Sequence, residues 1–250
     1  MKELRRAWLI ACLGMLCFPV WAQQDVFFVP DPQTAVWSYV TQDAAGQPTS
    51  RMIYSVEEMT GNAVNGSAKI KMQVVADQAP TDTVKSLIFY RFKEGECILD
   101  MQAVFGEALL GQVVEEALAQ EGKEVSPQEK QAAIAQMQER IKITGELRGI
   151  PRYPQIGALP DYKFRFKFMV MSMTMEGEER KITGKERIST PAGDYDCFVV
   201  EETVTMKAMM NKEVEKTVSW YAYGIGMVKQ LSYDKKGQLQ SVTLLDTINW

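Results

Sequence analysis

Four methionines occupy alternate positions in one stretch of the chain: Met169, Met171, Met173 and Met175. Alternate residues of a β-strand point to the same face of a sheet, so this spacing lines up four thioethers. Thioethers are soft ligands that suit Cu(I), but they also line apolar cavities and fill irregular cores. A copper site would need ligands from neighbouring strands, such as Met206 or Met209. We predict a surface for a lipid or other apolar ligand, or plain core packing, which is the simpler explanation, and no metal.

Carboxylates form the second group that could do chemistry: Asp194, Asp196, Glu201 and Glu202. Paired carboxylates carry out glycoside hydrolysis. Asp194 and Asp196, however, flank a turn, where aspartate is common because it bonds to the backbone, and Glu201 and Glu202 point to opposite faces of a strand. The sequence has no histidine, which excludes the Ser-His-Asp and Cys-His arrangements. We predict that the protein is not an enzyme and takes no cofactor.

The first residues predict export. A short basic region is followed by an apolar run over residues 8–18, which is too short to cross a bilayer. Small and tolerated residues then end at Ala22, as at a cleavage site. We predict a signal peptide over residues 1–22 and a periplasmic or otherwise exported protein. The alternative is a lipoprotein modified at Cys12, because residues 9–12 resemble a lipobox.

Charge and cysteine content restrict the partners of the exported part. The chain has a net charge of −4, and removal of three basic residues and one acidic residue with the leader leaves −6. Nucleic-acid binding needs concentrated positive charge, so we predict no nucleic-acid partner. No later segment is apolar enough for a membrane-spanning helix. Export permits a disulfide between Cys97 and Cys197, but two buried free thiols are the favoured interpretation.

Hydrophobic periodicity divides residues 23–250 into four segments. Residues 23–103 alternate apolar and polar positions between turn signals, which predicts an antiparallel N-terminal β half. Residues 104–141 change to helical spacing with a capping box at Ser126-Pro127-Gln128-Glu129, and the apolar stripe Ala133, Met137 and Ile141 completes a predicted helical hairpin. Residues 142–162 form a proline-rich connection, and residues 163–250 a C-terminal β meander. The predicted fold class is mainly β (α+β), a curved antiparallel sheet or half-barrel of about a dozen strands with an inserted helical hairpin.

One strand is predicted to change its surroundings along its length. If the chain stays extended from Tyr162 to Met175, the side chains of Lys163, Arg165 and Lys167 share a face with the methionine run. Four exposed methionines would form an unusual surface. We therefore predict that the methionine side of this strand packs under the helical hairpin and that its charged start lies in water.

The last third of the chain carries turn and aromatic motifs: Gly184-Lys185-Glu186-Arg187, Thr190-Pro191-Ala192-Gly193, Trp220-Tyr221-Ala222 and Gly224-Ile225-Gly226-Met227-Val228-Lys229. In these motifs the chain resembles the TapB-type family of exported bacterial proteins of unknown function, well over residues 184–248 and loosely over residues 34–248. The resemblance implies a half-barrel in the manner of bacterial lipoprotein carriers. It implies no catalytic residues, because the matching motifs are structural.

Two classes of function are compatible with these features. The first is a binding module, in which the curved sheet and the helical hairpin enclose an apolar ligand. The second is a structural or assembly component of the cell envelope without a small-molecule site. A large apolar cavity beside the methionine strand would favour the first class. A filled core with an exposed apolar patch or an open strand edge would favour the second.

Overall fold

The computed structural model describes residues 35–61, 64–77, 79–94, 96–104, 126–151, 153–168, 171–208 and 210–249. The predicted signal peptide and nearly all of the first predicted helix lie outside these residues. The described residues form 14 strands and two helices: β1 (Val36–Asp43), β2 (Pro48–Gly61), β3 (Gly66–Ala76), β4 (Ala79–Lys93), β5 (Glu96–Leu99), α2 (Met101–Ala103), α4 (Pro127–Gln138), β6 (Ile141–Gly145), β7 (Leu147–Pro151), β8 (Gly157–Ala158), β9 (Tyr162–Phe168), β10 (Met171–Thr190), β11 (Gly193–Ala208), β12 (Asn211–Ala222), β13 (Gly226–Asp234) and β14 (Leu239–Asn249).

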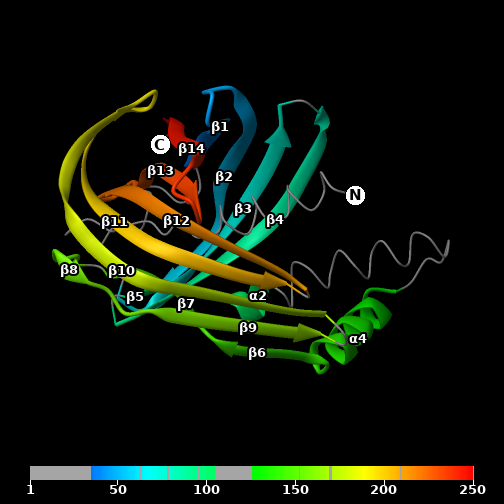
Figure 1. Cartoon of the computed structure of the whole chain (residues 1–250). Coiled ribbons are helices and arrows are strands. Elements are labelled where there is room, and N and C mark those ends of the chain that lie inside the picture. The colour runs from blue at the N-terminus through cyan, green and yellow to red at the C-terminus, as the bar shows by residue number, and fades with distance from the viewer. Residues whose placement is uncertain are drawn as a thin grey trace.

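All the strands belong to one antiparallel sheet that curls into a nearly closed barrel (Figure 1). The strand order is β6-β9-β10-β11-β12-β13-β14-β1-β2-β3-β4-β5-β7, with β8 beside β10. Most neighbours are consecutive in the chain, as expected of a meander. The prediction of a curved antiparallel sheet or half-barrel is confirmed.

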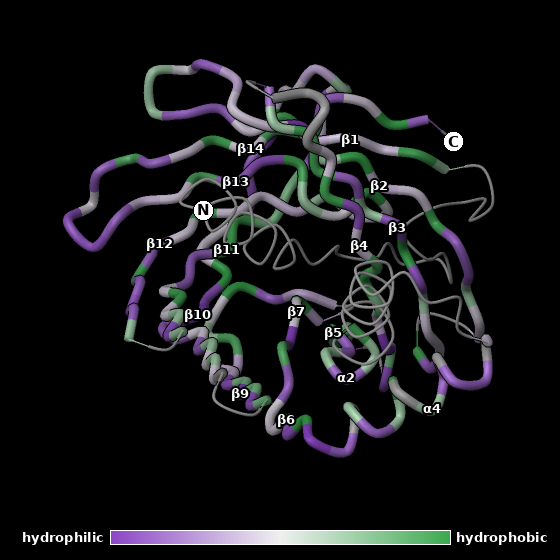
Figure 2. Tube along the Cα trace, turned by 90° about the vertical axis from the view of Figure 1, so that its right-hand side faces the viewer, coloured by the Kyte–Doolittle hydropathy of each residue, from purple (hydrophilic) through white to green (hydrophobic). Residues whose placement is uncertain are grey.

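Alternation of side chains builds the core. In β3, Ala68, Ile70, Met72 and Val74 are buried, and the residues between them are exposed or half-buried. Because directly paired residues of antiparallel strands share a face, the pairing of Ile70 with Ile88 places two fully buried side chains together. The hydropathy of the strands alternates in the same way along the chain trace (Figure 2).

The first and last strands of the sheet's long meander pair with each other. β1 and β14 are joined by eight register pairs, from Val36–Asn249 to Asp43–Ser241. Core aromatics hold β1 to β2 beside this joint, because the ring of Tyr54 stacks on Trp37 at a centroid distance of 5.5 Å and meets Tyr39 edge-on at 5.6 Å. Such geometries add to the stabilisation from burial alone.

Two turns on this side of the barrel have the same construction. The residues 43–47 and 234–238 share the pattern D-x-x-G-Q. In each turn the aspartate side chain accepts two backbone N–H bonds, and the glycine has a positive φ, +81° at Gly46 and +77° at Gly237. The shared residues therefore follow from one turn geometry that needs an aspartate acceptor and a glycine.

One short segment belongs to both ends of the sheet. β6 pairs with β9, whereas β7, which begins two residues later, pairs with β5 at the opposite end of the strand order. The switch occurs at Gly145, whose φ is +81°, and a Cβ there would lie 1.8 Å from the carbonyl oxygen of Lys163. Only glycine suits this position. The predicted proline-rich connection over residues 142–162 thus contains strands that draw the sheet into a barrel.

Helix α4 begins as the sequence predicts. Ser126 is its N-cap, Glu129 completes the capping box, and Pro127 stands in the first turn. The helix ends at Gln138, so Ile141, which the predicted helical stripe included, is instead the first residue of β6. The described side chains of α4 are exposed or half-buried, and the helix lies beside the ends of β6 and β9 (Figure 1). Among the described helices, none has the length and apolarity needed to cross a membrane.

Candidate functional site

The structure divides the methionine run. Met175 is buried in the core, Met173 is half-buried against it, the side chain of Met171 is not described, and Met169 lies outside the described residues. β9 ends at Phe168 and β10 returns antiparallel to it from Met171. The interpretation of one extended strand over these residues is therefore wrong.

The hairpin changes which side chains share a face. Met175 pairs directly with Phe164, and Met173 pairs with Phe166. The two methionines consequently lie on the buried side with the phenylalanines, and Lys163 and Arg165 lie on the other side. Whether helical residues cover the methionines concerns residues 105–125, which lie outside the described part.

Of the methionines considered as copper ligands, the described pair on neighbouring strands forms a contact within the core. Met175 pairs with Met206 of β11, and both side chains are buried among apolar residues. Met209 lies outside the described residues. Within the described ranges no group of three or more cysteine and acidic residues is placed to hold a metal ion.

The acidic residues singled out in the sequence are separated. Asp194 and Asp196 are exposed and face Arg187. Glu201 pairs with the exposed Lys181. Glu202, its neighbour in the chain, points to the other face, where its side chain is 10% exposed. The four carboxylates therefore form no pair of the kind that glycoside hydrolysis uses.

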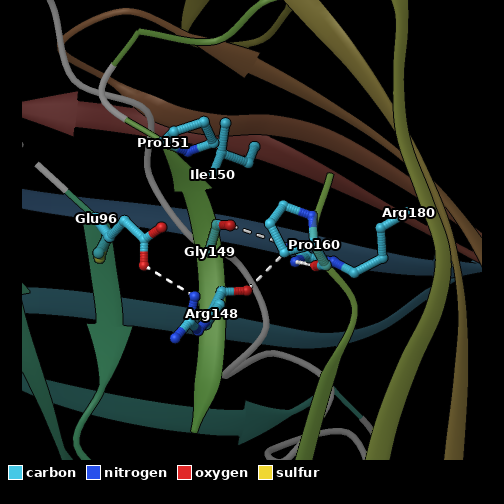
Figure 3. Close-up of a pocket in the computed structure, with 8 residues that line it drawn as sticks. Glu96, Arg148, Gly149, Ile150, Pro151, Pro160 and Arg180 are labelled. Atoms are coloured by element: carbon cyan, nitrogen blue, oxygen red, sulfur yellow. Dashed lines mark hydrogen bonds and ion pairs between the residues drawn. The ribbon is translucent and has the colours of Figure 1, made fainter. Parts of the chain in front are cut away.

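Arg180 is the central residue of the site, and the sequence analysis missed it. Its side chain is 2% exposed, and its Nε donates to the Glu202 carboxylate at 2.9 Å. Its remaining donors bond to three backbone carbonyls, those of Pro160 at 2.6 Å, Arg148 at 3.0 Å and Gly149 at 3.1 Å (Figure 3). The guanidinium also lies over the Tyr162 ring, 4.8 Å from its centroid.

These contacts close the gap between the two ends of the sheet, which we call the seam. Arg148 and Gly149 belong to β7, one end strand of the described sheet, and Arg180 belongs to β10 near the other end. Arg180 thus joins β7 to β10 and, through Glu202, to β11. At the seam, hydrogen bonds from one side chain hold β7 to β10, where neighbouring strands elsewhere are held by a backbone ladder.

A break in strand alternation turns Arg180 inward. The register of β10 against β11 shifts between Glu178 and Lys181, and Glu179 has a positive φ of 56°. Such a bulge re-aims a side chain. Gly177 makes room for the stacked ring below, because a Cβ at this position would lie 2.3 Å from atoms of Tyr162. The charged run Glu178-Glu179-Arg180-Lys181 looks like a solvated strand, so no pattern in it marks Arg180 as buried.

Burial dominates the electrostatics of the seam. It raises the pKa of the Glu202 carboxyl above its usual value, and Arg180 offsets only part of that rise. Burial, followed by the charge of Glu202, also raises the pKa of the Tyr162 phenol. The Tyr162 hydroxyl is buried without a hydrogen-bond partner. Perturbed groups clustered in an apolar core are typical of functional sites, although buried ion pairs also produce them.

A small pocket opens at the seam (Figure 3). Its volume is about 30 Å³, which is room for about one water molecule. It is lined by Glu96, Cys97, Arg148, Gly149, Ile150, Pro151, Pro160 and Arg180. The closed seam therefore leaves no room for a lipid at this place.

Both cysteines of the described chain are free and buried, as the sequence analysis favoured. Cys97 lies at the seam pocket, and Cys197 pairs across β11–β12 with Ala222. Burial raises the pKa of each thiol, that of Cys197 to about 12. Neither thiol is therefore set up as a nucleophile or metal ligand.

Comparison with known proteins identifies a family and a fold. The sequence matches the DUF3108-like family over residues 33–245. The structure resembles that of a candidate lipoprotein of Parabacteroides distasonis, with a TM-score of 0.59, 22% sequence identity and coverage of 91% of this chain and 100% of that chain. It also resembles a candidate exported protein of Bacteroides fragilis with a YmcC-like fold, with a TM-score of 0.60, 18% identity and coverage of 90% of this chain and 100% of that chain. No curated protein matches the sequence.

These comparisons agree with the half-barrel fold that the sequence motifs implied, but not with the family name. The family description is DUF3108-like, and it does not support the TapB-type name. The neighbouring structures are of proteins described as a candidate lipoprotein and a candidate exported protein, with the same overall fold. At such identities they show the fold, and function must be argued from the site.

Proposed function

We propose that this chain, which belongs to the DUF3108-like family, is an exported, non-enzymatic protein of the cell envelope that binds an apolar ligand on the core face of its curved sheet. The ligand reaches that face when the seam opens. The observation that carries this proposal is the seam itself, where one side chain, Arg180, holds β7 against β10.

A joint of this kind can open at low cost to the rest of the sheet. Hydrogen bonds of the Arg180 guanidinium join the described residues of β7 and β10, whereas any two neighbours in the strand order are held by a backbone ladder. Near Gly145 the chain itself links the two ends of the sheet, so the proposed opening is confined to the part of the seam around Arg180. The row behind the seam is apolar, since Phe164, Met175 and Met206 are directly paired on the buried side of β9, β10 and β11. Opening would expose this row to an apolar molecule.

Mass spectrometry of the intact, non-denatured protein tests the proposal. We expect the protein purified from its own envelope to carry a co-purified lipid. Recovery of the bare polypeptide alone would contradict ligand binding. The seam is tested separately with Arg180→Lys, which keeps the charge but loses the planar fork, and we expect faster uptake of the fluorescent probe N-phenylnaphthylamine. Lys181→Ala, which removes an exposed ion pair with Glu201, is the control and should leave uptake unchanged.

Export is supported by the leader-like first 22 residues and by the exported and lipoprotein descriptions of the neighbouring structures. We propose cleavage after Ala22 and a periplasmic location. N-terminal analysis of the exported protein should then begin at Gln23. A lipid-modified start at Cys12 would contradict this processing and attach the protein to a membrane surface.

A second candidate function is a structural or assembly role, and a surface patch favours it. Tyr153 and Ile156 are 57% and 66% exposed in the segment after β7, and Tyr223 is exposed at the β12–β13 turn. Burial raises the pKa of the Tyr223 phenol, and the charge of Tyr153 adds to the rise, so the two phenols lie within electrostatic reach of each other. Clustered exposed apolar residues mark interaction sites.

Binding to isolated envelope fragments tests the second role. The double variant Tyr153→Ser, Ile156→Ser should lower the fraction of protein that sediments with the fragments. Met210→Ser is the control, because Met210 is fully exposed outside the patch. Equal sedimentation of the two variants would argue against an assembly surface at this place.

A further inference from the structure

A set of polar side chains crosses the core face of the C-terminal meander and the first two strands. Thr41 pairs directly with Thr243 and with Ser50, and the same row continues from Thr243 through Gln230 to Ser219. A second row pairs Thr217 with Ser232. All are buried, and we call them the hydroxyl belt: Thr41, Ser50, Thr217, Ser219, Gln230, Ser232 and Thr243.

The belt lies on the same side of the sheet as the core. Tyr39 and Met52, which are buried in the core cluster, stand two residues from Thr41 and Ser50 and form the next direct pair. Residues two apart in a strand share a face. In a core face that is otherwise mostly apolar, seven neighbouring polar side chains call for an explanation.

Hydrogen bonds within the belt are incomplete. Gln230 donates to Ser219 at 3.0 Å, and the hydroxyls of Thr41 and Thr243 lie 3.1 Å apart. Ser50 and Thr217 have buried hydroxyls without any partner. Each is more than nine-tenths buried, at 4% and 2% exposure.

An unpartnered buried hydroxyl is unfavourable, by about 1–3 kcal/mol. Valine has the shape of threonine and would remove this cost at position 217. The Tyr162 hydroxyl is also unpartnered. It lies on the core face as well, because Tyr162 stands two residues from the buried Phe164 in β9. The core face thus holds hydrogen-bonding capacity that the closed protein does not use.

The belt adjoins both the seam and the apolar row behind it. Thr217 pairs directly with Glu202, the partner of Arg180 at the seam. Met206 lies four residues further along β11 on the same face, which is a distance of roughly 14 Å at the rise of a strand. A molecule that passed the seam would meet hydroxyls at one end and thioethers and rings at the other.

The charges beside the belt disfavour an anion. Glu202 already holds the cation Arg180. Glu215 accepts a bond from Ser232 at 2.7 Å, and burial raises the pKa of its carboxyl. A bound anion would meet these carboxylates, and the belt itself consists of neutral groups that both donate and accept.

We propose that the hydroxyl belt binds the uncharged, polyhydroxylated head group of an amphiphile, such as a glycosyl head, while the alkyl tail lies on the row formed by Phe164, Met175 and Met206. This inference rests on the proposed function and names the chemistry of its ligand. The unpartnered hydroxyl of Thr217, which lies beside Glu202 at the seam, gains a hydrogen bond from the head group.

Calorimetric titration below the micellar concentration tests the head-group choice with two amphiphiles of the same tail length. Octyl β-D-glucoside should bind, and sodium octanoate should bind at least tenfold more weakly. Thr217→Val should weaken glucoside binding about fivefold, as expected for one lost hydrogen bond of about 1 kcal/mol. Thr205→Val is the control, because Thr205 is buried on the opposite face of β11, and its affinity should equal that of the unchanged protein.

The outcomes separate the inference from the proposed function. Equal affinity for the two amphiphiles, or an unchanged affinity in Thr217→Val, would overturn the head-group inference and leave apolar binding in place. Binding of neither amphiphile would overturn both. The fold of Thr217→Val is checked by its unfolding midpoint, which should be no lower than that of the unchanged protein because a buried unpartnered hydroxyl has been removed.

Discussion

The barrel is held together in different ways at the β1–β14 pairing and at the seam. β1 and β14 meet through a backbone ladder of eight register pairs. At the seam, β7 meets β10 through the side chain of Arg180, which bonds to the carbonyls of Arg148 and Gly149. The ladder distributes its stability over many residues, whereas the seam concentrates it in one.

The difference concerns how far each joint depends on a single side chain. A ladder repeats the same backbone hydrogen bond along its length, so its stability does not depend on any single side chain. A buried guanidinium acts as a unit, because removal of one partner leaves the others uncompensated. Variants placed at matched positions of the two joints can measure this contrast.

The largest effect is expected for Arg180→Ala. The change leaves the largely enclosed Glu202 carboxylate without its cation and three carbonyls without a donor. We expect the free energy of unfolding to fall by about 3–5 kcal/mol, measured by urea denaturation.

The matched change at the ladder joint is Arg51→Ala. Arg51 forms an ion pair with Asp246 of β14, but its side chain is 45% exposed. We expect a loss of about 1 kcal/mol or less. If the two variants unfold at the same urea concentration, stability is not concentrated at the seam.

Gly177→Ala should be the next most damaging. A Cβ at position 177 would overlap the Tyr162 ring on which Arg180 lies, so the ring must move. Overpacking of this kind costs about 1–3 kcal/mol. Gly184→Ala in the same strand meets nothing within 4 Å and should change the midpoint of denaturation little. A harmless Gly177→Ala would mean that the ring does not support the seam.

Two tyrosines allow a direct comparison of the joints. The Tyr39 hydroxyl, at the ladder joint, donates to the carbonyl of Met227 at 2.8 Å. Tyr39→Phe should therefore cost about 1 kcal/mol. The Tyr162 hydroxyl, at the seam, has no partner, so Tyr162→Phe should be neutral or stabilising. Thermal unfolding of both variants is a sufficient measurement. A clear loss of stability in Tyr162→Phe would mean that the Tyr162 hydroxyl forms a stabilising hydrogen bond after all.

The smallest effect is a pH dependence carried by Glu202. Its pKa in the folded protein lies above the usual value, so the folded state binds a proton more readily than the unfolded state. Stability contributed by this group therefore rises as the pH falls through the folded pKa toward the unfolded one. Measured against Glu202→Gln, which does not titrate, the unchanged protein should gain relative stability between pH 7 and about pH 4.5. A relative loss would mean that the attraction of Arg180 outweighs burial.

Local patterns predicted the parts of the fold that depend on local chemistry. The alternation in β3 gave its buried face, and the capping box at Ser126 and Glu129 gave the start of α4. The D-x-x-G-Q turns behave in the same way, because the aspartate and the glycine act within five residues. The fold class follows from many such signals, so errors in single elements did not affect it.

The site could not be predicted because it depends on interruptions of those patterns. The hairpin between Phe168 and Met171 reverses the chain inside a run that keeps a period of two, which moved the methionines to the phenylalanine face. The bulge before Lys181 turned an apparent surface arginine inward. The partners of Arg180 come from positions 20 to 32 residues away, and the sequence gives no local sign of them.

The pairing of β1 with β14 also sets the order in which the protein can be completed. β1 joins β2 across a tight turn, but its other neighbour, β14, lies about two hundred residues later, with hydroxyl contacts such as Ser38–Thr247 spanning 209 positions. Contacts of such separation slow folding, because a long loop must close before they form. During synthesis or export β1 therefore keeps an unpaired edge until residues 239–249 arrive, and this edge is where we expect a chaperone, or another unfinished copy, to attach.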